Sequence, residues 1–155
     1  MGFSTFSGPL RAGPVREGAN RNTGLVVLSQ SFDTGDLDGS TVGNIDRAAF
    51  RLPAGAQIVD IVADQIEAAA GGTTTISVGN ASGGAQLMAG IATTAGGRFR
   101  GTATAATQAA WQLSADTVGW VRVAVGSGTL SAGRAIVTVL YVQRAADGSQ
   151  HPASA

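Results

Sequence analysis

The stretch RAIVTVLYVQ, residues Arg134–Gln143, decides the fold. Val and Ile are β-branched and favour extended backbone, and no Gly or Pro interrupts this stretch. Its two faces are both apolar, with Ile136, Leu140 and Val142 on one and Val137, Val139 and Tyr141 on the other. A run of this kind is typical of a strand covered on both sides, so we predict a central strand here.

Further strands are predicted on the N-terminal side of this stretch. They are Thr117–Val125, Thr73–Val78, Gln57–Glu67, Arg47–Leu52 and Leu25–Phe32. Alternation places Val26, Leu28 and Phe32 on one face of the first strand, and Ala48, Phe50 and Leu52 on one face of the next.

The connections between these strands are expected to be turns. Gly71-Gly72 is a stop signal, so Thr73–Val78 is expected to pair with Gln57–Glu67 as a hairpin, and Gly126–Gly133 to form a loop. Gln57–Glu67 also fits helical spacing, and a helix stays open as the alternative, although its β-branched residues favour a strand.

The pattern is weaker between Asn80 and Ala115. Arg98–Thr102 is a candidate strand, and Thr107–Leu113 a candidate helical turn that positions Trp111. About seven or eight strands without long helices indicate an all-β, single-domain β-sandwich or jelly-roll-like barrel over residues 25–145.

Residues 1–24 differ from this body and are predicted to form an extended arm, because Gly8-Pro9 and Gly13-Pro14 prevent regular strand pairing. Phe3 and Phe6 cannot be buried within such a segment, so they need a partner surface, whereas a disordered terminus is the alternative. Residues 146–155 read as a loose tail.

The composition limits the function. The 155 residues include ten Arg, ten Asp plus Glu, no Lys and no Cys, which gives a formal net charge of zero. Neutrality argues against nonspecific nucleic-acid or membrane partners, and the absence of Cys excludes thiol catalysis. The N-terminus does not resemble a secretory signal, so we expect a protein that is not exported by a cleavable signal.

Two acidic groups are candidate sites. Asp33, Asp36 and Asp38 resemble half of a calcium loop, but the EF-hand spacing fails and a solvated turn is favoured. Asp60 and Asp64 share a face and could act as paired carboxylates in a glycoside hydrolase, although salt bridges to Arg are favoured.

The remaining candidates point to no enzyme. His151, the single His, lies in the tail, where it cannot be held against a nucleophile. Gly126–Ser131 resembles a dinucleotide loop but is expected to precede a strand rather than a helix. Trp111 and Trp120 are expected to be core or interface anchors. We therefore predict no catalytic residues, no cofactor and no metal.

Several motifs together resemble those of tailed-bacteriophage capsid decoration proteins, also called cement or head-stabilising proteins. They are FSGPLRAG at Phe6–Gly13, TGLVVLSQ at Thr23–Gln30, LPAGAQIVDI at Leu52–Ile61, TISVGN at Thr75–Asn80 and RAIVTVLYVQ at Arg134–Gln143.

The resemblance implies a small, often trimeric β protein on the outside of the virion that bridges neighbouring major capsid subunits, commonly through an N-terminal arm. It would be made in the host cytoplasm. Shell or neighbour contacts would be assigned to Phe3, Phe6, Pro9, Leu10, Arg11 and Arg16. The alternative is a tail or head-fibre module, or a carbohydrate-binding sandwich in which Trp111 or Trp120 stacks on sugar.

Overall fold

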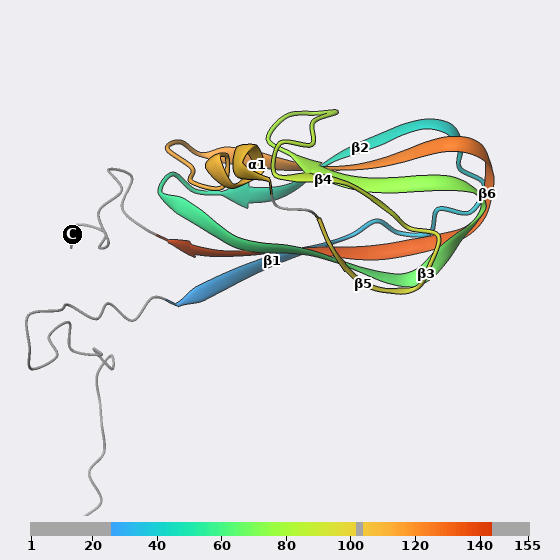
Figure 1. Cartoon of the computed structure of the whole chain (residues 1–155), viewed down its shortest axis with the longest axis horizontal. Coiled ribbons are helices and arrows are strands. Elements are labelled where there is room, and N and C mark those ends of the chain that lie inside the picture. The colour runs from blue at the N-terminus through green and yellow to red at the C-terminus, as the bar shows by residue number, and fades with distance from the viewer. Residues whose placement is uncertain (1–25, 102–103, 144–155) are drawn as a thin grey trace, which may run out of the picture.

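The computed structural model describes residues 26–101 and 104–143, and in them an antiparallel sheet of six strands folds into two layers (Figure 1). The elements are β1 (Val27–Asp33), β2 (Thr41–Leu52), β3 (Ala56–Gly79), β4 (Met88–Ala92), β5 (Gly97–Arg100), α1 (Ala105–Ala109) and β6 (Thr117–Gln143). The predicted all-β, single-domain fold is confirmed. The predicted arm and tail lie outside the described residues.

The two longest strands, β3 and β6, bend at one end of the molecule and run through both layers (Figure 1). One layer has the order β1-β6-β3-β5, and the other has the order β2-β6-β3-β4. Each layer therefore holds four strand segments, which explains why seven or eight strands were expected although six continuous ones are present.

The predicted hairpin between Gln57–Glu67 and Thr73–Val78 is wrong, because both segments belong to β3 and pair with β6. Gly126–Gly133 is likewise the bend of β6 and not a loop. Gly71 and Gly128 have φ of +81° and +74°, which suits Gly, and they lie against each other where both strands bend. The glycines thus bend the strands where we expected them to end the strands.

The helical alternative for Gln57–Glu67 is also wrong, and β-bulges explain why the spacing looked helical. The register against β6 shifts once at Val59 and again at Ile66, so each is an extra residue in β3. The first bulge separates the buried Ile58 and Ile61 by three positions. Both bulged side chains face solvent, Val59 at 50% and Ile66 at 60% exposure.

The core lies between the two layers. Its largest fully buried side chains are Phe50, Leu52, Ile76, Leu87, Leu130, Val78, Val121, Val137, Val139 and Thr93. The predicted central strand is confirmed, because Arg134–Gln143 lies between β1 and β3. Ala48 is exposed and does not share the face of Phe50, since a register shift in β2 separates the two.

The region of weak signal contains two short strands and the helix. β5 overlaps the predicted Arg98–Thr102, whereas β4 was not predicted. The side chains and backbone of Thr104 and Thr107 form a reciprocal cap at the start of α1. Just beyond it, the Trp111 indole N–H donates to the Leu87 carbonyl at 2.8 Å, as expected of a core anchor.

Candidate functional surface

The described residues begin and end at the same end of the sandwich. Val27 pairs directly with Val142, so the start of β1 lies beside the end of β6 (Figure 1). The arm residues predicted to make contacts, Phe3, Phe6, Pro9, Leu10, Arg11 and Arg16, lie outside the described residues. The surface around the start of β1 is therefore the part of the body closest to the arm along the chain.

Exposed aliphatic side chains gather at this end, and we call them the apolar pole. They are Val26, Val27, Leu28 and Val59, with exposed fractions of 75%, 51%, 42% and 50%. Leu28 and Ile58 both pair with Tyr141, which places the bulged Val59 two strands away from Leu28 at the same height. As predicted, Val26, Leu28 and Phe32 share one face: Leu28 pairs with the buried Tyr141 and Phe32 with the buried Val137, so this is the inner face of the layer. Val26 and Leu28 nevertheless stay exposed, because the start of β1 lies apart from the other layer (Figure 1), and Val27 points to the outer face.

A hollow of about 450 Å³ opens beside the apolar pole. Its lining is mainly apolar and comes from both layers: Arg51, Leu52, Pro53, Asp116, Thr117, Val118 and Tyr141. Gln30 is hydrogen-bonded to two of these lining residues, Arg51 and Tyr141. Its amide donates to the Arg51 carbonyl at 2.6 Å and to the Tyr141 hydroxyl at 3.2 Å, and its carbonyl accepts from the Arg51 backbone N–H at 2.9 Å. A side chain of β1 thus joins this layer to β2 in the other.

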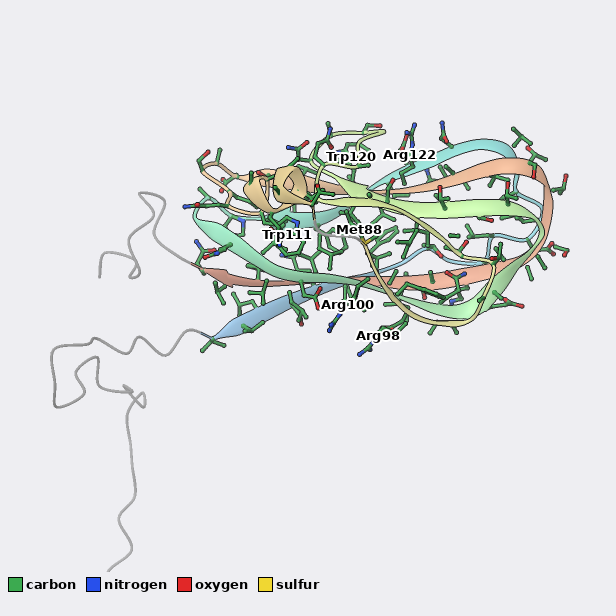
Figure 2. All side chains as sticks on the ribbon, viewed as in Figure 1. Met88, Arg98, Arg100, Trp111, Trp120 and Arg122 are labelled. Carbon is green, nitrogen blue, oxygen red and sulfur yellow. The ribbon has the colours of Figure 1, made fainter. Side chains whose placement is uncertain are left out.

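Ion pairs cover the outer face of the β1-β6-β3-β5 layer. Arg98 binds Asp64 through two nitrogens at 2.6 and 3.0 Å, and Arg100 lies 3.0 Å from Asp60. Both arginines come from β5 and point to the outer face (Figure 2). The predicted salt bridges of Asp60 and Asp64 are thereby confirmed, and each carboxylate is held by its own arginine.

Contacts with arginine lower the pKa of two carboxylates, those of Asp64 and Asp33. The side-chain hydrogen bond from Arg98 holds the pKa of Asp64 below its usual 3.8, and the positive charge adds to this. The hydrogen bond from Arg134 lowers the pKa of Asp33 in the same way. Both groups therefore stay ionised at neutral pH, whereas a general acid would need a raised pKa.

The acidic loop is a hydrogen-bonded turn. Asp33 Oδ1 accepts the Gly35 N–H and Asp36 Oδ1 accepts the Asp38 N–H, both at 2.9 Å. Across residues 26–101 and 104–143, no three His, Cys, Asp or Glu side chains are grouped to hold a metal. His151 lies outside this part of the chain. Within the same ranges, no helix is long and apolar enough to cross a membrane.

The outer face of the other layer carries Trp120 and Arg122 (Figure 2). Trp120 pairs with the small residues Ala48 and Gly79 on its two sides. Arg122 lies 3.2 Å from Asp46 and donates to the Gly83 carbonyl at 2.8 Å. Because Trp111 packs against the core, Trp120 is the Trp on an outer face.

Sequence reasoning missed the apolar pole and the hollow. The unbroken run Leu25–Leu28 was the available signal, because four successive apolar residues cannot all face one core. The bulge that exposes Val59 depends on its register with β6, which the local sequence does not contain.

Comparison with known proteins identifies the fold. No protein-family model matches the sequence, and no curated protein matches it. A chain in the acidic stable capsid structure of Helicobacter pylori bacteriophage KHP30 is similar with a TM-score of 0.56 and 16% identity, over 77% of this chain and 90% of that chain. A chain in the capsid of Ralstonia phage GP4 gives 0.54 and 22%, over 88% and 94%. The fold is thus one found in phage capsid structures, in agreement with the resemblance to phage proteins.

Proposed function

We propose that this chain is a non-enzymatic structural protein of a phage virion. In this proposal it decorates the outside of the major capsid shell as a homotrimer and stabilises the shell, and its N-terminal arm bridges neighbours. The observation that carries the proposal is the two-layer fold shared with chains in the KHP30 and GP4 capsid structures.

Two observations support a small capsid-associated subunit. The alignments cover most of both partners, so the matched chains are of similar, small size. The second observation is the strand order. If each half of β3 and of β6 is counted as a separate strand, the eight segments can be numbered 1 to 8 along the chain, and their order is 1-8-3-6 in one layer and 2-7-4-5 in the other. This is the order of a jelly roll, which is common among viral capsid domains.

The body and the arm have different roles in this proposal. Four of the six arginines in the described body pair with aspartates, and its outer face around Trp120, which is flanked by Ala48 and Gly79, can lie flat against another copy. Phe3, Phe6 and Leu10 supply apolar area for the shell, and a trimer presents three arms at once. Multivalency then converts weak single contacts into stable attachment.

Truncation tests the proposal. A chain that begins at Gly24 should stay folded but lose most of its binding to empty shells, measured by co-sedimentation. A chain lacking residues 146–155 is the matched control and should bind normally. Unchanged binding by the chain that begins at Gly24 would show that the arm has no bridging role.

A further inference from the structure

The apolar pole is an unusual concentration of exposed hydrophobic side chains. Among the described residues six large hydrophobic side chains are exposed, and four of them (Val26, Val27, Leu28 and Val59) lie at this end. Scattered surface aliphatics need no explanation, whereas a group beside an apolar hollow marks a contact surface. The residues of the apolar pole lie on β1 and β3, and the hollow lies next to them between the two layers.

The hollow has the chemistry of a side-chain pocket. Leu52, Pro53, Val118 and the ring of Tyr141 provide apolar walls, and its volume of about 450 Å³ accepts an aromatic side chain. Gln30 fixes Tyr141 and Arg51 at its edge through three hydrogen bonds, so this side of the hollow is braced. A preformed apolar pocket favours a rigid apolar side chain.

A suitable segment is attached to the pole itself. Residues Phe3–Leu10, FSTFSGPL, include two Phe and a Leu and carry no charge, whereas the first Arg follows at position 11. The chain from Leu10 to Val26 can span up to about 50 Å when extended, at roughly 3.3 Å per residue. This reach allows the segment to return to the end from which it leaves.

We infer that the apolar pole and the hollow are the docking site for residues Phe3–Leu10 of the same chain. Attachment within one chain favours this occupant over a second copy, because a short flexible linker gives an effective concentration in about the millimolar range. Because Val27 points away from the face that carries Leu28 and Tyr141, the docked segment crosses the start of the edge strand β1: it covers the exposed valines on the outer face and places an aromatic ring in the hollow on the inner face. The inference concerns the free protein and does not depend on the proposed function.

Disulfide trapping tests the inference cleanly, because the chain has no Cys. Ser4→Cys with Ser29→Cys should cross-link within one full-length chain under mild oxidation, since Ser29 is an exposed β1 residue beside the pole. Replacing Phe3 and Phe6 by Ser in this background should slow the reaction about tenfold, because the tether remains but the docking is lost. Val27→Ser with Val59→Ser should slow it similarly.

Two controls separate docking from chance encounter. Val42→Ser changes an equally exposed valine outside the pole and should leave the rate unchanged. A mixture of the Ser4→Cys and Ser29→Cys single variants should give few cross-linked dimers. Efficient dimer formation would assign the pole to a second copy. A cross-linking rate that is unchanged by substitution of Phe3 and Phe6 or of the pole valines would show that no docking occurs. Either result overturns the inference.

Discussion

At the scale of single residues, the side chain of Gln30 takes the place of backbone pairing between β1 and β2. Its amide forms the pattern of hydrogen bonds that a paired backbone would offer to Arg51, and it also reaches Tyr141. β1 and β2 belong to different layers, so no ladder joins them along this edge. One side chain therefore holds the two layers together beside the hollow.

We predict that Gln30→Ala lowers the free energy of unfolding by about 1–2 kcal/mol, since exposed groups regain water as a partner but the bridge is lost. The measurement is urea unfolding followed by Trp fluorescence. Ser31→Ala is the matched control: it removes an exposed hydroxyl contact with Thr138 within one layer and should cost less than about 0.5 kcal/mol. Equal effects of the two substitutions would contradict the bridging role.

Asp64 makes the stability of the body depend on pH, and the direction of this dependence follows from the lowered pKa of Asp64. The hydrogen bond from Arg98 keeps the folded-state pKa of Asp64 below 3.8, so the carboxylate contributes stability above this value. That contribution is lost as the pH falls below about 3.8 and through the folded-state pKa. The pair is exposed, so the effect is small and weakens with salt.

We predict that Asp64→Asn loses less stability than the wild type when the pH is lowered from 5 to 2 (about the range in which carboxylates titrate). Arg98→Gln removes the same hydrogen bond from the other side and should show the same shallow pH profile. The double variant should match either single variant, because the two residues act as one pair. Additive effects of the two substitutions would refute a shared origin.

At the scale of elements, the bends of β3 and β6 determine the architecture. Gly71 has φ of +81°, and an added Cβ would clash with the carbonyl oxygen of Thr129 on the neighbouring strand. Gly35 has a similar φ of +73°, but an added Cβ there would meet no atom within 4 Å. Alanine substitutions at the two positions therefore separate the loss of stability due to the backbone conformation from the loss due to close contact between the strands.

Gly71→Ala should therefore lower the free energy of unfolding by about 3 kcal/mol, of which the positive φ accounts for about 1 kcal/mol. Gly35→Ala should cost only the latter, about 1 kcal/mol. Urea denaturation of both variants measures the difference. Similar losses at the two positions would mean that the bend tolerates a side chain and that close packing there is not essential.

The strands could be predicted from sequence, but their continuity could not. Alternation located both halves of β6 and the strand segment Thr73–Val78, because each of them has a covered side. Whether Gly71-Gly72 ends a strand or bends it depends on whether β6 bends at the same place. Met88–Ala92 escaped prediction because it has five residues with Gly90 in its centre, too little for a clear period.

The candidate surface shows the same limit. The ion pairs of Asp60 and Asp64 were expected from charge alone, since a buried or half-buried carboxylate needs a cation. The apolar pole follows instead from a bulge at Val59 and from the position of the start of β1 at the end of a layer. Both depend on partners distant in sequence, which a local pattern does not contain.

At the scale of the whole molecule, the body and the arm differ in the charge and the apolar side chains that they can offer to a partner. Four of the six arginines in the described body, at positions 98, 100, 122 and 134, each pair with an aspartate, so these four offer little free charge to a partner. The arm has a net charge of +2 and two Phe. Recognition in the proposed virion role therefore rests on the arm, and a homotrimer should show three times the chain mass of 15.4 kDa by light scattering.

Docking of the arm on the pole and binding of the arm to a shell would compete for the same apolar residues. If about nine arms in ten are docked, the apparent affinity for a shell is reduced about tenfold, because only the undocked fraction binds. Val27→Ser with Val59→Ser should therefore bind empty shells more tightly than the wild type, by up to about tenfold. These substitutions should lower the free energy of unfolding by up to about 1.4 kcal/mol, because docking at nine arms in ten stabilises the folded chain by that amount.

This last prediction separates the two proposals. Tighter binding by the pole variant, with lost binding by the chain that begins at Gly24, agrees with an arm that changes partner. Val42→Ser, an exposed valine outside the pole, should bind like the wild type. If the pole variant instead loses shell binding as the truncated chain does, the pole itself contacts the shell, because removing a competitor cannot weaken an interaction. Affinities measured by co-sedimentation over a range of protein concentrations distinguish these outcomes.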